Sequence, residues 1–319
     1  NRKAVNKIDS MKVLIIGLGS IAKKHIAALK EIDSNIEIYA LRSNKNAESF
    51  DNVVNIYDIS ENSKDFDFAI ISNPTSLHAS SITSILKLNI PLFIEKPVFE
   101  SLEYDDLLNN ISKIGLITYV ACNLRFLDSL KFLHDYIQNN PNQRINEVNV
   151  YCGSYLPEWR PGTDYRKCYS AIPELGGGVH IDLIHDIDYV YWIFGKPIAS
   201  NGICRNVSSL DIRAIDYANY QLIYPGFTAS IILNYYRRDY KRKLEVVFEN
   251  STWTVDIKSN SIYNENGCLI FKGENSPIET YKTQLEYFIN SITNGDKPEN
   301  DVNTAYDVLK ICLSYERLK

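Results

Sequence analysis

The feature that most constrains the fold is a glycine-rich turn near the start of the sequence. Residues 12–16 form a short apolar run that predicts a strand, and residues 21–30 have the pattern of a helix. Between them, residues 17–22 have the sequence G-L-G-S-I-A, a G-x-G-x-x-A turn. In such a turn the first glycine permits a tight bend, the second lets the backbone approach a pyrophosphate, and the helix N-terminus favours phosphates. The residues predicted to contact a dinucleotide here are Gly17, Gly19, Ser20 and Ile21.

The remainder of the first third alternates between strands and helices. Apolar strand patterns occur at 37–41, 68–72, 92–94 and 117–121, with helical stretches between them. Alternation of this kind indicates right-handed parallel crossovers and a doubly wound parallel sheet. We therefore predict an α/β Rossmann domain that binds NAD(P), formed by residues 11–121.

The sequence after residue 121 has a different organisation, and 319 residues exceed what one hydrophobic core usually supports. A helical pattern at 129–138 and an alternating strand at 147–155 are followed by β-rich runs, which are separated by Pro225-Gly226, by a charged turn and by Asn250. The runs are 217–223, 228–235, 243–249 and 252–257, and the last two helical patterns are 281–293 and 302–317. We predict an α+β domain over residues 122–319, with a largely antiparallel open sheet.

Composition and charge exclude several classes of protein. Hydrophobic residues make up 45% of the chain and charged residues 23%, as in globular proteins, and no apolar run approaches the roughly 18 residues that cross a membrane. The net charge is −5, and the basic cluster within residues 237–243 is short. We therefore predict neither a nucleic-acid partner nor a membrane partner.

The cysteines and the first residues bear on the cellular compartment. The six cysteines contain no C-x-x-C pair, which argues against a zinc site and against a disulfide framework. Residues 1–10 are polar and lack the apolar segment of a signal peptide, and Met11 is the only methionine. We expect a cytoplasmic protein without a metal site, whose residues 1–10 are a leader or a remnant of expression.

The end of the second predicted strand bears on the choice of cofactor. An NAD-selective site usually places an acidic residue there on the ribose hydroxyls, whereas this chain has Arg42 and Ser43. A guanidinium fork can form paired charge-assisted hydrogen bonds with the 2′-phosphate of NADP. We therefore expect NADP to be favoured over NAD.

Three further motifs carry a resemblance to a known family. Residues 73–78 read N-P-T-S-L-H, residues 95–97 read E-K-P, and residues 176–188 read G-G-G-V-H-I-D-L-I-H-D-I-D. Together with the glycine turn they resemble the glucose-fructose oxidoreductase, inositol dehydrogenase and rhizopine catabolism family, Gfo/Idh/MocA. The resemblance implies a Rossmann domain followed by an open antiparallel sheet that carries the substrate and contributes oligomer contacts. It also implies an active site between the two domains and a homodimer or homotetramer.

The resemblance assigns Lys96 of the E-K-P motif to both the nicotinamide ribose and the substrate. A lysine beside a reacting hydroxyl can orient it and stabilise oxyanion character, although Lys96 could instead be a surface partner of Glu95. The Lys96–Pro97 peptide bond is often cis in the family. The other residues that the resemblance brings to the cofactor are Asn73, Pro74, His78 and Glu95 of these motifs and Asn123 of the segment A-C-N-L-R-F, residues 121–126.

Asp182 and His185 are the candidates for proton transfer, together with Lys96. Their spacing of three would put both on one face of a helix, where the carboxylate could orient the imidazole or raise its pKa. The commoner family spacing is four, so either His185 or His180 could be the acid/base. We favour His185, because its I-H-D-I-D context matches the family.

Candidate substrate groups surround these residues. Arginine and tyrosine together suit a polyhydroxylated or anionic ligand, through bidentate bonds to carboxylate or phosphate and through stacking on a sugar face. With 22 tyrosines in the chain, however, any one of them could equally belong to the core. The candidate substrate-binding residues are Lys96, Arg125, Trp159, Arg160, Tyr165, Arg166, Asp182 and His185, with Tyr169 nearby.

These features predict an NAD(P)-dependent oxidoreductase that acts on a secondary alcohol or ketone of a sugar, sugar acid or nucleotide sugar. Residues 164–192 also resemble family members of surface-polysaccharide and nonulosonic-acid pathways. Two alternatives stay open. One is a redox-neutral lyase or hydrolase that oxidises its sugar transiently on bound cofactor, and the other is a non-catalytic NADP-binding regulator.

Overall fold

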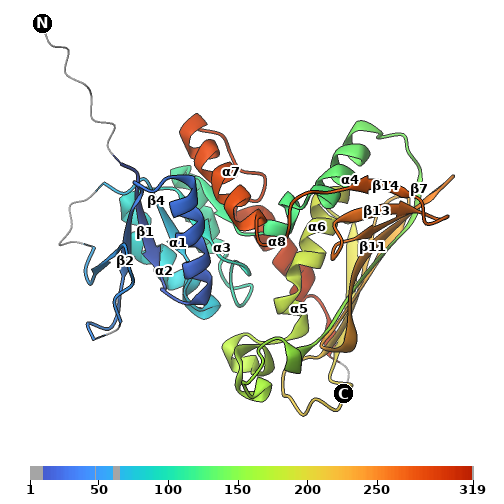
Figure 1. The fold of residues 1–319 in the computed structure, drawn as a ribbon, viewed down its shortest axis with the longest axis horizontal. Coiled ribbons are helices and arrows are strands. Elements are labelled where there is room, and N and C mark those ends of the chain that lie inside the picture. Colours follow the sequence, from blue (N-terminus) through green and yellow to red (C-terminus); the bar gives the residue numbers. More distant parts are fainter. Residues whose placement is uncertain (1–9, 47, 60–64, 318–319) are drawn as a thin grey trace, which may run out of the picture.

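The computed structural model describes residues 10–46, 48–59 and 65–317, which form two domains (Figure 1). The first contains a six-stranded parallel sheet in the order β3-β2-β1-β4-β5-β6. Its strands are β1 (Lys12–Ile16), β2 (Glu37–Leu41), β3 (Val53–Ile56), β4 (Phe68–Ile71), β5 (Leu92–Ile94) and β6 (Thr118–Val120). The predicted Rossmann sheet is confirmed. Strand β3 was not predicted, because it lies at the edge of the sheet and only Ile56 of its four residues is buried.

The helices of this domain include one from the far end of the chain. They are α1 (Ser20–Ile32), α2 (His78–Ile85), α3 (Asp105–Ile114) and, over the same sheet, α7 (Thr280–Asn294). The Phe288 ring of α7 packs edge-on against Phe68 and Phe93, with centroids 5.3 and 5.6 Å apart. Because Leu285 and Phe288 share a core with β1 and α1, α7 completes the first domain.

The second domain contains a nine-stranded sheet in the order β14-β13-β12-β11-β7-β10-β9-β8-β15. Its strands are β7 (Ile145–Tyr155), β8 (Ala199–Arg205), β9 (Tyr217–Ile223), β10 (Thr228–Asn234), β11 (Tyr236–Phe248), β12 (Thr252–Asp256), β13 (Ser261–Asn264), β14 (Leu269–Lys272) and β15 (Glu316–Arg317). Two of the pairings, β7 with β10 and β8 with β15, are parallel and the other six are antiparallel. The predicted, largely antiparallel sheet is confirmed.

Four helices lie between this sheet and the first domain, as Figure 1 shows. They are α4 (Asp128–Asn139), α5 (Val179–Asp182), α6 (Ile184–Phe194) and α8 (Val302–Leu313). Short 3-10 turns join the elements: η1 (Thr75–Leu77), η2 (Leu86–Leu88), η3 (Asn123–Phe126), η4 (Leu156–Glu158), η5 (Tyr165–Lys167), η6 (Tyr169–Ala171) and η7 (Pro173–Leu175). Helices α5 and α6 therefore lie where the two domains face each other.

Two predicted segments differ in the structure. The charged turn before residue 243 belongs to β11, where Arg242 pairs with Cys152 of β7 and its guanidinium bonds buried Asp186. The sequence indicated a turn here because the outward-facing side chains of this part of β11 are charged. The last helix ends at Leu313 instead of residue 317, and residues 316–317 form β15. The division of the chain at residue 121 and the role of residues 1–10, nine of which lie outside the described residues, stay predictions.

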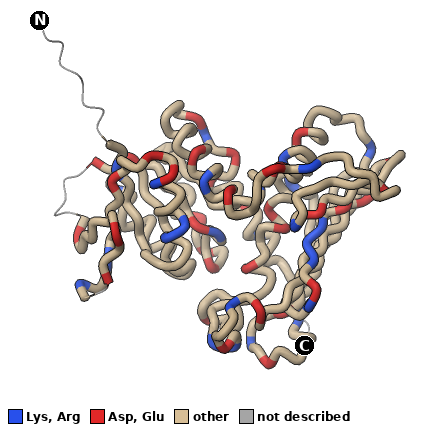
Figure 2. Tube along the Cα trace, viewed as in Figure 1, with Lys and Arg blue, Asp and Glu red and all other residues tan. Residues whose placement is uncertain are grey.

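Acidic and basic side chains are interspersed over both domains (Figure 2). No helix in the described part of the chain is both long and apolar enough to span a membrane. Within the same residues, no group of three or more His, Cys, Asp or Glu side chains is placed to hold a metal ion. All six cysteines are free thiols.

Candidate active site

A cleft of about 450 Å³ lies between the two domains. Its floor is the carboxyl edge of the parallel sheet, where ligands of doubly wound folds usually bind. Its other wall comes from α5, α6 and the turns before them. The lining residues are Gly19, Ser20, Ile21, Ser72, Asn73, Pro74, Thr75, His78, Glu95, Lys96, Ala121, Asn123, Arg160, Tyr169, Leu175, Asp182, His185, Tyr281 and Gln284. The cleft thus brings most of the predicted cofactor residues together with all three predicted catalytic residues.

The glycine turn is shaped to admit a pyrophosphate. Gly17 has φ +95°, and a Cβ there would lie 2.3 Å from the backbone nitrogen of Asn73, so only glycine fits. Gly19 is extended, with no atom within 4 Å of a Cβ position, and it lines the cleft. Gly19 is also the N-cap of α1 and provides no side-chain cap, so the first N–H groups of the helix can bind an anion. These residues fit the phosphates of a dinucleotide.

His78 and Asn73 organise the edge of the cleft after β4. The ring nitrogens of buried His78 lie 3.1 Å from Val98 O and 3.0 Å from Asn73 O, and burial lowers the pKa of His78. Both oxygens are acceptors and the neutral ring carries one N–H, so the ring donates to one of the two. Asn73 Nδ2 donates to Ser81 Oγ (2.8 Å), whereas Asn73 Oδ1 is buried without a hydrogen-bond partner in the described structure. A polar group of a bound ligand would satisfy that oxygen.

Lys96 connects the two domains. Its Nζ donates to the backbone oxygen of Asp182 (2.9 Å), and its backbone N–H donates to Glu95 Oε2 (3.2 Å). Glu95 Oε1 in turn lies 2.5 Å from Nε2 of buried His25 on α1. The ammonium therefore points into the cleft and does not form the surface pair with Glu95 that the sequence left open. The Lys96–Pro97 peptide bond is cis.

Asp182 and His185 both line the cleft although they do not share one continuous helix. Helix α5 ends at Asp182 and α6 begins at Ile184, with Leu183 between them. The Asp182 carboxylate accepts a hydrogen bond from the hydroxyl of Tyr235. Burial and this carboxylate raise the pKa of Tyr235 and also that of Tyr169. Both phenols therefore stay protonated and fix the position of Asp182.

His185 is held neutral by its surroundings. Burial is the main cause that lowers its pKa well below 6.5, and the nearby charges of Lys96 and Arg242 lower it further. Its Nδ1 is buried without a partner among the described residues. A neutral imidazole beside an ammonium can accept a proton. His180, the alternative acid/base, does not line this cleft but a neighbouring pocket.

Several predicted substrate residues lie outside the cleft. Arg125 is buried and forms a bidentate pair with Asp188, with distances of 2.8 and 2.7 Å. Trp159 Nε1 donates to Ser154 Oγ (3.0 Å), and the indole packs on Tyr235. The Tyr165 hydroxyl donates to Leu210 O (2.9 Å), and exposed Arg166 pairs with Asp164. Of this group of arginines and aromatic residues, only Arg160 and Tyr169 line the cleft.

Arg42 and Ser43 lie at the carboxyl end of β2, beside the glycine turn at the end of β1. Arg42 is half-buried, and its Nη1 donates to Glu48 O (3.2 Å) and Asn55 Oδ1 (3.1 Å). Ser43 is exposed. Their place along the sheet edge matches the ribose position of a dinucleotide whose pyrophosphate lies on Gly19.

The polar residues of the site that the sequence interpretation did not name are Ser72, Thr75, Tyr235, Tyr281 and Gln284. Tyr235 follows β10 and binds Asp182, but among 22 tyrosines nothing singles it out. Tyr281 and Gln284 reach the cleft only because α7 packs on the first domain. No local pattern could have indicated them.

Two family models match the chain. One, described as an oxidoreductase family with an NAD-binding Rossmann fold, matches residues 11–120. The other, described as the GFO/IDH/MocA C-terminal domain, matches residues 133–254.

Curated relatives are distant. An uncharacterized oxidoreductase, YrbE, of Bacillus subtilis is 25% identical over 233 residues, which cover 69% of this chain and 65% of that protein. Glucose-6-phosphate 3-dehydrogenase of the same organism is 25% identical over 245 residues, which cover 70% of this chain and 66% of the relative. The chain therefore spans about two thirds of the length of each.

Solved structures share the fold over nearly the whole chain. Levoglucosan dehydrogenase in complex with NADH and levoglucosan has a TM-score of 0.81 at 14% identity, with 95% of both chains covered. The WlbA dehydrogenase from Bordetella pertussis in complex with NADH and UDP-GlcNAcA has a TM-score of 0.78 at 18% identity, with 96% of this chain and 95% of that chain covered. At these identities the likeness shows the fold alone.

Proposed function

The chain belongs to the GFO/IDH/MocA oxidoreductase family, and from that membership we propose that it transfers a hydride between NAD(P) and a secondary alcohol or ketone of a sugar, sugar acid or nucleotide sugar. One observation carries the proposal. Lys96, Asp182 and His185 line the same cleft as the glycine turn. A phosphate-binding turn and a proton-accepting group within one cleft suit the oxidation of an alcohol.

Most of the cofactor site would come from the first domain, whereas Lys96 of the first domain and Asp182 and His185 of the second would act on the substrate. Gly19, Ser20 and the N-terminus of α1 would bind the pyrophosphate, and Asn73 and Asn123 line the same cleft as Lys96. When bound, the nicotinamide supplies the hydride acceptor or donor. Lys96 would orient the substrate hydroxyl and stabilise its developing oxyanion.

In the oxidation direction, His185 would take the hydroxyl proton. Its lowered pKa keeps the imidazole neutral, so an acceptor nitrogen is present before substrate arrives. Asp182, fixed by Tyr235, would accept a hydrogen bond from the substrate and neutralise part of the positive charge that forms on His185. In the reduction direction the same imidazole would return the proton.

The first test of this function is a titration of the purified protein with NADPH and NADH, in which nicotinamide fluorescence measures binding. Sugar acids, sugar phosphates and nucleotide sugars are then added to the loaded protein. Binding of a dinucleotide with a fluorescence change that depends on substrate is the expected result. No binding of either nucleotide would remove the proposed function and leave only the fold.

Replacing Gly19 by alanine is expected to weaken dinucleotide binding at least about tenfold without destabilising the protein. The backbone conformation at Gly19 suits alanine and nothing lies within 4 Å of the added methyl group, so the fold is unaffected. The methyl group would occupy the space of the pyrophosphate. Fluorescence titration measures the affinity and calorimetry the stability. Gly226→Ala, which also meets no neighbour and does not line the cleft, is the matched control.

Histidine NMR should show that His185 titrates below its ordinary pKa of 6.5. Because the pKa is lowered, His185 stays neutral as the pH falls through 6.5 and becomes charged only at a lower pH. Alcohol oxidation should therefore lack an acid limb near pH 6.5. Lys96→Met removes one of the lowering charges, so the midpoint of His185 should rise. A midpoint at 6.5 or above in the unmodified protein would contradict this assignment.

We propose that NADP is preferred over NAD, with Arg42 as the residue responsible. Replacing Arg42 by alanine is expected to raise the KM for NADP about tenfold and to leave the KM for NAD unchanged, because only NADP carries the 2′-phosphate. Steady-state kinetics with both nucleotides measure the two constants. Equal KM values for the two nucleotides in the unmodified enzyme would refute the preference.

We also propose a cytoplasmic homodimer or homotetramer that assembles through the outer face of the nine-stranded sheet. Among the described residues, no helix covers that face, and an uncovered sheet favours association (Figure 1). The resemblance of residues 164–192 favours substrates from surface-polysaccharide or nonulosonic-acid metabolism. Size-exclusion chromatography with light scattering tests the oligomeric state.

A further inference from the structure

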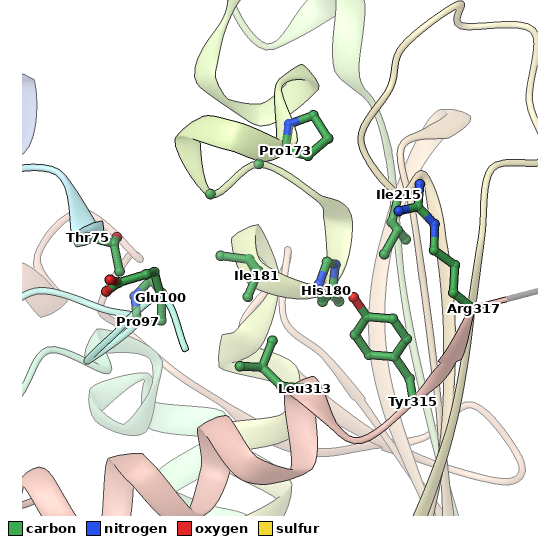
Figure 3. Close-up of a pocket in the computed structure, with 12 residues that line it drawn as sticks. Thr75, Pro97, Glu100, Pro173, His180, Ile181, Ile215, Leu313, Tyr315 and Arg317 are labelled. Carbon is green, nitrogen blue, oxygen red and sulfur yellow. The ribbon is translucent and has the colours of Figure 1, made fainter. Parts of the chain in front are cut away.

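A second pocket of about 190 Å³ lies beside the catalytic cleft, and the mechanism above does not use it (Figure 3). Thr75 lines both the pocket and the cleft. Pro97 and Ile181 of the pocket directly adjoin Lys96 and Asp182 of the cleft. A ligand in the pocket would therefore be a neighbour of a substrate bound at the reactive residues.

The first domain contributes a hydrogen-bond acceptor to this pocket. Glu100 Oε1 accepts from the hydroxyl of Tyr104, whereas Oε2 is buried without a partner in the described part of the chain. A buried carboxylate oxygen needs a donor. A hydroxyl group of a ligand would supply it, and an anionic group would be repelled from this wall.

The second domain contributes donors on the opposite wall. Figure 3 shows His180, Tyr315 and Arg317 across the pocket from Thr75, Pro97 and Glu100. His180 is 5% exposed, and its Nδ1 has no partner among the described residues. Burial and the charge of Arg317 lower the pKa of His180 to about 4, so its ring is neutral near pH 7 and carries one N–H.

The backbone of Arg317 is held by the sheet, and its exposed side chain lines the pocket. It lies in β15, which pairs with β8 so that Arg317 is opposite Cys204. Its guanidinium fork can bind a phosphate or carboxylate through two hydrogen bonds. The wall of Arg317 thus suits an anion, and the wall of Glu100 suits a hydroxyl.

We propose that this pocket binds the anionic substituent of the substrate whose alcohol reacts beside Lys96 and His185. The substrate is then a sugar phosphate or a sugar acid and not a neutral polyol. This inference rests on the proposed function. The volume of the pocket suits one substituent with its neighbouring hydroxyl groups, and Glu100 sets the orientation because it repels the anion from its own end.

Matched neutral and anionic sugars test the proposal. Glucose is compared with glucose 6-phosphate and glucuronate, and N-acetylglucosamine with its 6-phosphate, by isothermal titration into protein saturated with NADP or NAD. The two anionic arms distinguish phosphate from carboxylate. We expect at least one anionic compound to bind about tenfold more tightly than its neutral counterpart.

Replacing Arg317 by glutamine should abolish this difference and leave the affinity for the neutral sugar unchanged, and Arg317→Lys should restore part of it. Arg144→Gln is the matched control, because it removes an exposed arginine that pairs only loosely with Glu249, at 3.9 Å. A preference lost in Arg160→Gln but kept in Arg317→Gln would place the anion in the cleft and overturn the proposal.

Two other results would also overturn it. One is that no anionic compound binds more tightly than its neutral counterpart, and the other is that no anionic compound binds at all. If nicotinamide nucleotides still bind and neutral sugars still turn over, only this inference fails and the proposed function stands.

Discussion

Replacing His185 by alanine is expected to lower kcat by about 10²–10⁴-fold while dinucleotide affinity stays the same. The imidazole lies in the cleft with Lys96 and Asp182, and burial keeps it neutral, so its removal leaves the substrate proton without an acceptor. The glycine turn, which would bind the cofactor, is on the other domain. Turnover and nucleotide fluorescence therefore separate the two effects.

The matched control is His134→Ala. His134 is half-buried on α4, where its ring stacks on Trp192 at 4.0 Å, and it does not line the cleft. Its replacement should leave kcat within about twofold of the unmodified value, because the ring lies outside the cleft and contacts none of the reacting groups. Unchanged turnover in His185→Ala would remove His185 from proton transfer. A large loss in His134→Ala would show that the assay reports stability and not chemistry.

Motifs with local physical causes predicted their own positions well. The bend at Gly17 is required by contact with Asn73, and the E-K-P segment follows a buried strand directly. Both segments follow strands of the parallel sheet, and the carboxyl ends of these strands lie at the same edge. The alternating pattern of strands and helices is therefore enough to place both segments at the cleft. The first domain and the cofactor side of the cleft are predictable from sequence for this reason.

Proximity in sequence was a poor guide where the chain turns tightly. Asn123 lines the cleft, but two residues later in the 3-10 turn η3 Arg125 points away from it to Asp188. The same applies to Trp159, which lies next to Arg160 yet packs on Tyr235. A side chain two residues along a turn can face another element, and only the tertiary structure fixes which one.

Long-range packing also had no sequence signal. Tyr281 reaches the cleft because Phe288, two turns further along α7, packs into the core of the first domain. The prediction began strand β11 only at residue 243 because the outward residues before it are charged, whereas partly buried Arg242 pairs with fully buried Asp186. The apolar pattern indicates which face of a strand or helix is buried, but it does not indicate which distant element covers that face.

Replacing Arg125 by methionine is expected to lower the free energy of unfolding by about 3–5 kcal/mol, because it leaves the carboxylate of Asp188 buried without its partner. Both side chains are nearly inaccessible, with 5% and 3% of their surface exposed. Asn300 Oδ1, which accepts from Arg125 at 3.1 Å, loses a donor as well. Urea unfolding followed by circular dichroism measures the change.

The sequence assigned Arg125 to the substrate, and the same variant distinguishes that role from a structural one. If the role of Arg125 is structural, the double variant Arg125→Met, Asp188→Leu should recover much of the lost stability, because no unpaired buried charge remains. It also predicts that the KM for the sugar stays within about twofold in either variant, measured well below the unfolding temperature, as expected for residues outside the cleft. A KM that rises tenfold or more in Arg125→Met with little loss of stability would return Arg125 to the substrate site. That result would require the pair with Asp188 to open when substrate binds.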